Sequence, residues 1–249
     1  MTGDTRRIAV LSDIHGNIAA LEAVLHHAGQ RDVDLFVNLG DICSGALWPR
    51  ETADRLMALD WPTIRGNHER QVLQGDPAAM GLSDRHARDS LRDDQIAWLA
   101  ALPATLDLGD GALLVHGTPG SDLEYFLETV DEGGLRAATA DEAAQRAGKV
   151  SASLILCGHT HVQRAVQLDD GRLIVNPGSV GLPAYDDDRP FPHAVETGTP
   201  HARYAVISHG ERGWEATFHL VAYDWEQAAR DALANDRPDW ARALLTGRV

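Results

Sequence analysis

The sequence predicts an α/β fold. Five short runs rich in Val, Ile and Leu have the continuous apolar character of strands that are buried on both faces. They lie at residues 8–17, 34–41, 63–69, 112–117 and 153–161. Between the early runs lie three segments with helical apolar spacing, at residues 18–30, 49–60 and 85–102. Strands that alternate with helices are typical of a sheet covered by helices, with functional residues at the carboxyl ends of the strands.

The second half of the chain changes to a hairpin pattern. Residues 164–178 and residues 203–224 each predict two strands joined by a turn that contains glycine, the first turning at Asp170. We therefore expect these later strands to be antiparallel. The tail, residues 225–249, predicts two short helices that are interrupted near Pro238.

We expect a single domain that spans residues 1–249. A chain of 249 residues with 44% hydrophobic side chains is long enough to bury a core. The polar segment 118–149 is a candidate lid or edge subdomain, and residues 182–202 are expected to form a loop insertion. The start resembles no signal peptide, no apolar run reaches the roughly 18 residues of a membrane span, and two cysteines cannot form a disulfide framework. These features predict a cytoplasmic protein.

The charge of the chain limits its partners. A formal net charge of −15 disfavours binding to a nucleic-acid polymer or to an anionic membrane, because both are bound mainly through Lys and Arg. An anionic ligand would need strong positive charge in its own site. An acidic surface is compatible with a monomer and with a dimer.

Side chains that bind metal ions gather at the ends of the predicted strands. They are Asp13, His15, Asp41, Asn67, His116, His159 and His161. These donors are too many for one tetrahedral zinc ion, and they suit two ions that share a bridging carboxylate. The pairs in "DIH" and "HTH" are two residues apart, so an extended backbone would point both members of each pair to one side.

A lone histidine in any of these runs is most simply an ordinary core or surface residue. The joint placement argues against that explanation. A glycine stands close to most of the candidate ligands, at positions 16, 40, 66, 117 and 158, and permits the tight turns that ligand-bearing loops need.

The motifs "DIHGN", "GD", "GNHE", "HG" and "GHTH", in this order and followed by "NPGS", closely resemble the calcineurin-like metallophosphoesterase superfamily, bacterial phosphodiesterase-like branch. The resemblance implies a four-layer αββα sandwich, with two mixed β-sheets flanked by helices and a dinuclear metal centre at one rim. It implies that Asp41 bridges two ions, one held by Asp13, His15 and His161 and the other by Asn67, His116 and His159. It also implies that His68 faces the scissile phosphate, where it holds the phosphoryl oxygens or protonates the leaving oxygen.

Such a centre is suited to the hydrolysis of phosphate esters. Two divalent ions about 3.5 to 4 Å apart lower the pKa of a bridging water, so that hydroxide attacks without a protein nucleophile. Carboxylate, amide and imidazole ligands suit manganese, iron or zinc better than copper(I). We expect Mn²⁺ first, with iron, zinc or nickel as alternatives, and a small phosphorylated substrate that is attracted to the ions.

We therefore expect a metal-dependent phosphoesterase, with a phosphodiester ahead of a monoester as substrate because of the resemblance. Protein phosphatases and dinucleotide polyphosphate hydrolases are the enzymatic alternatives, but they carry an arginine shortly after their "GD", whereas here the first is Arg50. This departure also leaves the carboxylate partner of His68 unidentified. A non-catalytic scaffold of the same fold is the alternative of another class, and the complete ligand set disfavours it. Arg65 and Asn176 are candidates for substrate contact.

Overall fold

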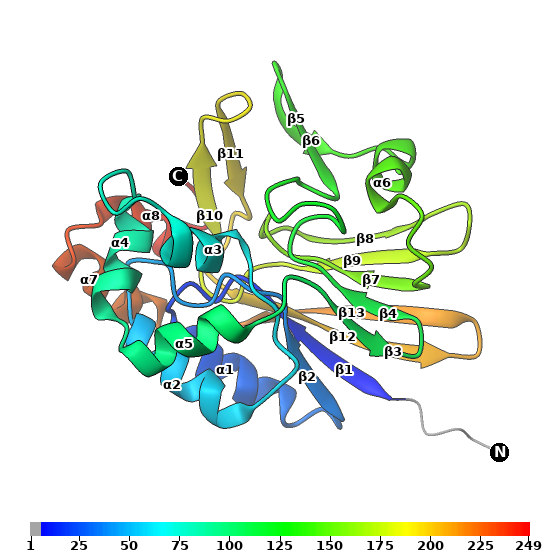
Figure 1. The fold of residues 1–249 in the computed structure, drawn as a ribbon, viewed down its shortest axis with the longest axis horizontal. Coiled ribbons are helices and arrows are strands. Elements are labelled where there is room, and N and C mark those ends of the chain that lie inside the picture. The colour runs from blue at the N-terminus through cyan, green and yellow to red at the C-terminus, as the bar shows by residue number, and fades with distance from the viewer. Residues whose placement is uncertain (1–5) are drawn as a thin grey trace.

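Two β-sheets packed face to face form the centre of the structure, a computed structural model that describes residues 6–249 (Figure 1). Residues 1–5, part of the charged start in which we expect no signal peptide, lie outside the described residues. The first sheet has the order β13-β12-β1-β2, and the second has the order β3-β4-β7-β9-β8. Both sheets are mixed, as expected.

The first sheet contains the early part of the chain. Its strands are β1 (Arg7–Leu11), β2 (Leu35–Asn38), β12 (Ala202–Gly210) and β13 (Gly213–Val221). β1 pairs with β2 in parallel and with β12 antiparallel, and β12 and β13 form the predicted hairpin. Because β1 and β2 are parallel, the loops after their carboxyl ends leave the sheet at the same edge.

The second sheet contains the middle of the chain. Its strands are β3 (Leu106–Gly109), β4 (Ala112–Leu114), β7 (Leu154–Leu156), β8 (Gln163–Gln167) and β9 (Leu173–Pro177). β4, β7 and β9 are parallel, and β8 pairs antiparallel with β9 in the other predicted hairpin. The strand β3 was not predicted.

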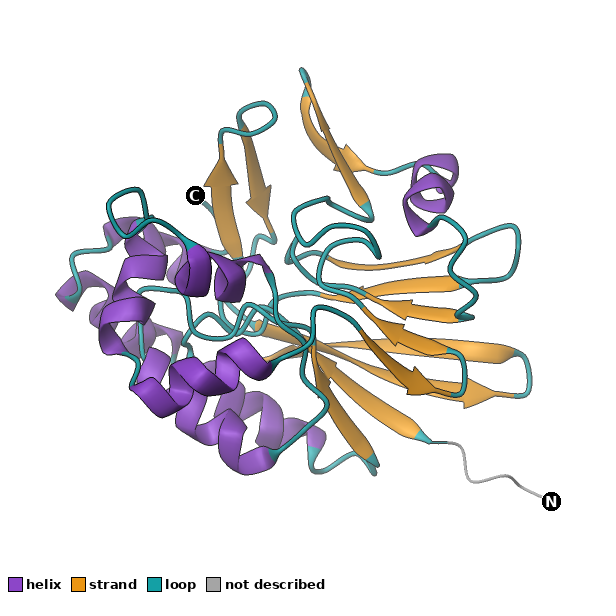
Figure 2. Ribbon diagram, viewed as in Figure 1, coloured by secondary structure: helices purple, strands orange, loops and turns teal. Residues whose placement is uncertain are grey.

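Apolar side chains on alternating faces of the strands create the layers. Ile8 and Val10 of β1 pack against Leu114, Leu154 and Leu156 of the second sheet, because the side chains of a strand alternate between its two faces. The outer face of the first sheet packs against α1 (Ile18–Ala28), α2 (Pro49–Leu59) and α5 (Asp93–Ala101) (Figure 2). The outer face of the second sheet packs against α6 (Ala140–Ala147). The predicted four-layer arrangement is confirmed.

Two of the predicted elements were wrong. The segment 85–102 forms two helices, α4 (Leu82–Ser90) and α5, because the backbone is extended at the intervening Leu91 and Arg92. Residues 63–69 form only an isolated bridge at Thr63, after which α3 (Asn67–Gln74) begins.

Two hairpins rise beside the sheets, and we call the segments that contain them the first hairpin segment (118–149) and the second hairpin segment (182–202). The first contains β5 (Glu128–Asp131), β6 (Gly134–Ala137) and α6, and the second contains β10 (Ala184–Asp187) and β11 (His193–Glu196). The chain ends in α7 (Trp225–Ala234) and α8 (Pro238–Thr246), the two helices predicted for the tail. Within residues 6–249, none of the helices has both the length and the apolar character of a membrane span.

Candidate metal centre

The candidate ligands lie in turns with an unusual backbone. Five of them have a positive φ: 55° at Asp13, 52° at His15, 54° at Asp41, 70° at His159 and 59° at His161. Residues with a side chain disfavour this left-handed region by about 1 to 2 kcal/mol each, and such residues cluster at functional sites. The extended backbone that we predicted for "DIH" and "HTH" was therefore wrong, because the chain curls immediately after each strand.

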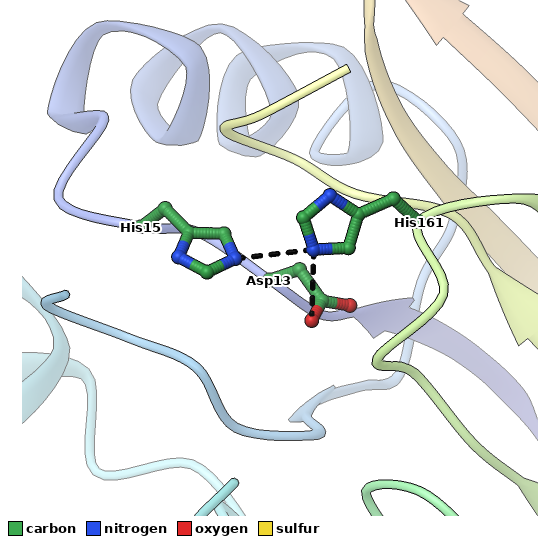
Figure 3. A group of neighbouring side chains, drawn as sticks. All are labelled: Asp13, His15 and His161. Carbon is green, nitrogen blue, oxygen red and sulfur yellow. Dashed lines mark hydrogen bonds and ion pairs between the residues drawn. The ribbon is translucent and has the colours of Figure 1, made fainter. Parts of the chain in front are cut away.

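The first group of ligands consists of Asp13, His15 and His161 (Figure 3). The Nδ1–H group of His15 donates to the Ser44 carbonyl at 2.7 Å, and that of His161 donates to the Leu182 carbonyl at 2.7 Å. Both Nε2 atoms are then bare when the rings are neutral, and they face each other at 3.1 Å. An Asp13 oxygen lies 3.4 Å from His161 Nε2. Two buried lone pairs and a carboxylate at these distances fit a bound cation, which would relieve their mutual repulsion.

The second group consists of Asp41, His116 and His159, with Asn67 beside it. His116 donates from Nδ1 to the Leu39 carbonyl at 2.8 Å, so its Nε2 points into the group. That Nε2 lies 3.1 Å from Asp41 Oδ2 and 3.1 Å from Asn67 Oδ1. An imidazole, a carboxylate and an amide oxygen therefore meet at one point, as a divalent ion requires.

The two groups are neighbours. The backbone N–H of His159, in the second group, donates to the carboxylate of Asp13, in the first group, at 3.2 Å to its nearer oxygen. The ring of His159 is oriented by its Nε2–H group, which donates to the Leu123 carbonyl at 3.1 Å and leaves Nδ1 bare. The structure thus brings all seven predicted ligands to one rim of the sheets. One histidine of "HTH" joins each group.

Burial and neighbouring charges set the protonation of these groups. Burial and the adjacent His161 lower the pKa of His15 to about 4, and burial and the adjacent His116 lower the pKa of His159 to about 4. Burial would also lower the pKa of His116, but the Asp41 carboxylate outweighs it and raises this pKa to about 10. Two imidazoles are therefore neutral at pH 7, and the third holds a proton at a position that suits a metal ion.

His68 is held by a carboxylate that the sequence did not reveal. Its Nδ1 lies 2.7 Å from Asp84 Oδ1, and Asp84 also accepts a hydrogen bond from the Ser44 hydroxyl. Burial would lower the pKa of His68, but Asp41 and Asp84 outweigh it and raise this pKa to about 9. His68 is therefore a protonated donor beside the ligand groups. Asp84 lies on α4, and no local pattern links it to His68.

The sequence of this chain matches a known family. The model of the calcineurin-like phosphoesterase superfamily domain matches residues 7–196. The chain belongs to this superfamily. An uncharacterized protein of Methanocaldococcus jannaschii is 26% identical over an aligned length of 259, and the alignment covers 97% of this chain and 98% of that protein.

Two solved structures share the fold of this chain. A metallophosphoesterase from Sphaerobacter thermophilus is 26% identical, with a TM-score of 0.74 and coverage of 98% of this chain and 100% of that one. A putative diadenosine tetraphosphatase shares the fold at 17% identity and a TM-score of 0.51, with coverage of 90% and 97%.

In this calcineurin-like phosphoesterase, a second buried carboxylate supports the site. Glu69 accepts hydrogen bonds from the backbone N–H groups of Asp41, Ile42 and Gly66, each at 2.8 Å. It therefore ties the "GD" loop to the "GNHE" loop and caps the start of α3. The sequence motif contained Glu69, but we assigned it no role.

The two predicted substrate contacts lie elsewhere in the structure. Asn176 is buried and donates to the Gly158 carbonyl at 2.7 Å and to Thr160 Oγ1 at 2.9 Å, which supports the "GHTH" loop. Arg65 is half-buried and is not among the described residues that line the cavity at the site. Neither Arg65 nor Asn176 is among the described residues that line the cavity, so the structure gives no support to a role of either in substrate contact.

A cavity of about 1210 Å³ opens over both ligand groups. Its walls come from candidate metal ligands and His68, from both hairpin segments, and from α8, which lies beyond the matched domain. Trp240 of α8 packs edge-on against the His15 ring at 6.0 Å. Arg237 lies over the Trp240 ring at 5.5 Å and donates to Asp239 and Ser83. The C-terminal helix therefore shapes the site.

Proposed function

We propose that this protein is a metal-dependent phosphoesterase that hydrolyses a small organic phosphate, with a phosphodiester as the preferred substrate. The observation that carries the proposal is the convergence of two groups of side chains that could hold metal ions beside His68, which is paired with Asp84, at the base of a large cavity. Membership of the calcineurin-like phosphoesterase superfamily supports the same reaction.

The ligand set divides between two ions. Asp13, His15 and His161 would hold one ion, Asn67, His116 and His159 the other, and Asp41 would bridge them. When bound, two such ions supply a water activated at neutral pH and positive charge for the phosphoryl oxygens. We propose manganese first, because oxygen and imidazole ligands suit it, with iron, zinc and nickel as alternatives.

His68 would act on the leaving group. The Asp84 carboxylate raises the pKa of His68, which favours the protonated ring, and it fixes the ring by the bond at Nδ1. The Nε2–H group is then the one that can donate to the leaving oxygen or to a phosphoryl oxygen. General acid catalysis of this kind contributes about 10² to 10⁴ in rate.

The diester preference draws support from the cavity, which is much larger than a phosphate group and has room for an organic group on either side of it. One observation favours a second candidate. Arg237 and Arg242 line the same cavity as His68, and an arginine there would suit a dinucleotide polyphosphate or a phosphoprotein monoester. A non-catalytic scaffold is disfavoured because the ligand set and His68 are all in place.

The location and the partners of the protein are part of the proposal. Both cysteines, Cys43 and Cys157, are buried and free, which supports a reducing, cytoplasmic location. We propose a small phosphorylated molecule as the partner, and a monomer or dimer that binds neither a nucleic-acid polymer nor a membrane.

The first test compares two chromogenic substrates. The protein is stripped of metal, loaded with Mn²⁺, and assayed with bis(p-nitrophenyl) phosphate and with p-nitrophenyl phosphate, beside the His68→Ala variant. We expect faster turnover of the diester, a requirement for metal, and a loss of about 10² to 10⁴ in kcat with His68→Ala at unchanged metal content. Asp41→Ala should instead lower the metal content.

The possible results separate the candidate functions. Faster cleavage of the monoester would favour the phosphatase alternative. Two bound ions without hydrolysis of either ester would favour the scaffold. Absence of bound metal under these conditions would refute the metal centre itself.

A further inference from the structure

Each histidine of the "GHTH" motif is held by a different hairpin segment. The first hairpin segment supplies the Leu123 carbonyl, which accepts from His159 Nε2 at 3.1 Å. The second supplies the Leu182 carbonyl, which accepts from His161 Nδ1 at 2.7 Å. Because a carbonyl only accepts, these contacts leave Nδ1 of His159 and Nε2 of His161 bare. The hairpin segments therefore decide which nitrogen each histidine presents to its ligand group.

Each hairpin segment also supplies a tyrosine to the same histidine. The Tyr125 ring packs edge-on against His159, with centroids 5.0 Å apart and an interplanar angle of 75°. The Tyr185 ring packs edge-on against His161 at 4.7 Å and 67°. Each tyrosine follows the carbonyl of its segment by two or three residues. One carbonyl and one ring therefore restrict each imidazole on two sides.

The two tyrosines are joined to each other. Their hydroxyl oxygens are 2.7 Å apart, and Tyr125 Oη is 3.0 Å from His193 Nε2. Because His193 donates from Nδ1 to the Phe191 carbonyl at 2.8 Å, its Nε2 accepts the hydrogen of Tyr125 when the ring is neutral. The hydrogen of Tyr185 then points toward Tyr125, with the His159 carbonyl at 3.3 Å as its other acceptor. The direction of the whole chain of hydrogen bonds is thus set by one histidine of β11.

We propose that Tyr125 and Tyr185 are positioning residues that couple the two ligand groups, because their hydroxyl bond fixes the spacing of the two "HTH" histidines. This inference rests on the proposed metal centre. The hairpins themselves also touch through β6 and β11, which stand side by side in Figure 1. The hairpin segments form a joined wall of the cavity, and a change on one side reaches the metal ligand on the other.

The test is a double-mutant cycle read by metal binding. Mn²⁺ is titrated into the metal-free full chain, and free Mn²⁺ is followed by electron paramagnetic resonance for wild type, Tyr125→Phe, Tyr185→Phe and the double variant. Phenylalanine keeps the ring and removes only the hydroxyl. We expect each single variant to weaken binding by about 10-fold, at the low end for residues that orient metal ligands. The double variant should bind Mn²⁺ only slightly more weakly than the single variant with the lower affinity, because both substitutions break the same hydrogen bond.

The matched control is Tyr204→Phe. Tyr204 also bonds to a histidine, His27 Nδ1 at 2.8 Å, but it lies in the core among α1 and β12. We expect the Tyr204→Phe variant to bind Mn²⁺ with the affinity of the wild-type protein. Exchange coupling in the spectrum of the loaded protein should change in the Tyr125 and Tyr185 variants and stay unchanged in the control.

Unchanged Mn²⁺ affinity in both single variants would overturn the inference, and so would losses that multiply fully in the double variant. Hydrolysis is not the readout, so this result is separate from the proposed function. A protein that binds two ions and cleaves no ester would sink the proposed reaction, while the affinities would still decide the role of the tyrosines. A wild-type protein that binds no Mn²⁺ would overturn both.

Discussion

The pair formed by His68 and Asp84 offers the sharpest prediction. The Nδ1 atom of His68 lies 2.7 Å from the carboxylate, which contributes to its pKa of about 9. A carboxylate at this distance raises a histidine pKa by about 1 to 3 units. Since 29% of the His68 side chain is exposed, water screens the interaction and the effect should lie near the low end. Asp84→Asn should therefore lower this pKa by about one unit, or about 1.4 kcal/mol.

The consequence is visible in the pH dependence of kcat. In the proposed reaction the protonated form of His68 is the acid, so kcat should be retained below the pKa of His68 and lost as pH rises through it. In Asp84→Asn this loss should begin about one unit lower, and kcat on the plateau should fall by about 10-fold because the ring is no longer oriented. The assay is hydrolysis of bis(p-nitrophenyl) phosphate by the Mn²⁺-loaded protein over a pH series.

Two controls accompany this measurement. Asp89→Asn removes an exposed carboxylate from the same helix and should leave the profile unchanged. In a His68→Ala background, Asp84→Asn should cause little further loss, since its effect passes through His68. An unshifted alkaline limb, or an equal loss in the His68→Ala background, would refute the reasoning.

Three further results are expected. Glu69→Gln should lower the free energy of unfolding by about 3 kcal/mol, because three buried backbone N–H groups lose a charged acceptor; an unchanged melting temperature would contradict this. Gly66→Ala should lower the amount of bound Mn²⁺, measured by mass spectrometry, by about 10-fold or more, because a methyl group there would overlap the Asp41 carboxylate. Gly81→Ala is the control: the added methyl group would meet no other atom, so this variant should bind Mn²⁺ like the wild-type protein. Metal binding at pH 7 should release about one proton, since the His116 pKa of about 10 means that its proton must leave; calorimetric heats that do not depend on the buffer would exclude this.

Much of the candidate metal centre could be predicted from short motifs. Six of the seven candidate ligands stand within a few residues of a buried strand, as His159 and His161 follow the apolar run 154–157, whereas Asn67 follows an isolated bridge at Thr63. The carboxyl ends of parallel strands lie at one edge of a sheet. A local apolar run followed by a polar side chain therefore predicted that side chains far apart in the sequence would lie close together. The conformation at those ends was not predictable in the same way. Hydrogen bonds between loops impose the left-handed turns, such as that from the His15 N–H to the Asp41 carbonyl at 3.0 Å.

The errors in secondary structure have a local cause that a periodic pattern does not reveal. The apolar spacing continues through 85–102, although the helix stops at Ser90 and restarts at Asp93. The Gln95 side chain accepts from the Arg92 backbone N–H at 3.0 Å and caps the second helix.

The sequence by itself determined the α/β class and the seven candidate ligands, because these depend on runs of burial and on residues next to the ends of predicted strands. The resemblance of its motifs to the calcineurin-like superfamily added His68 beside them. Only the tertiary structure decided that Asp84 holds His68, that Tyr125 and Tyr185 meet over the "HTH" motif, and that α8 lines the cavity. These contacts join segments with no common period or spacing. Their distances depend on how layers and loops pack, which follows from the summed contacts of the whole chain.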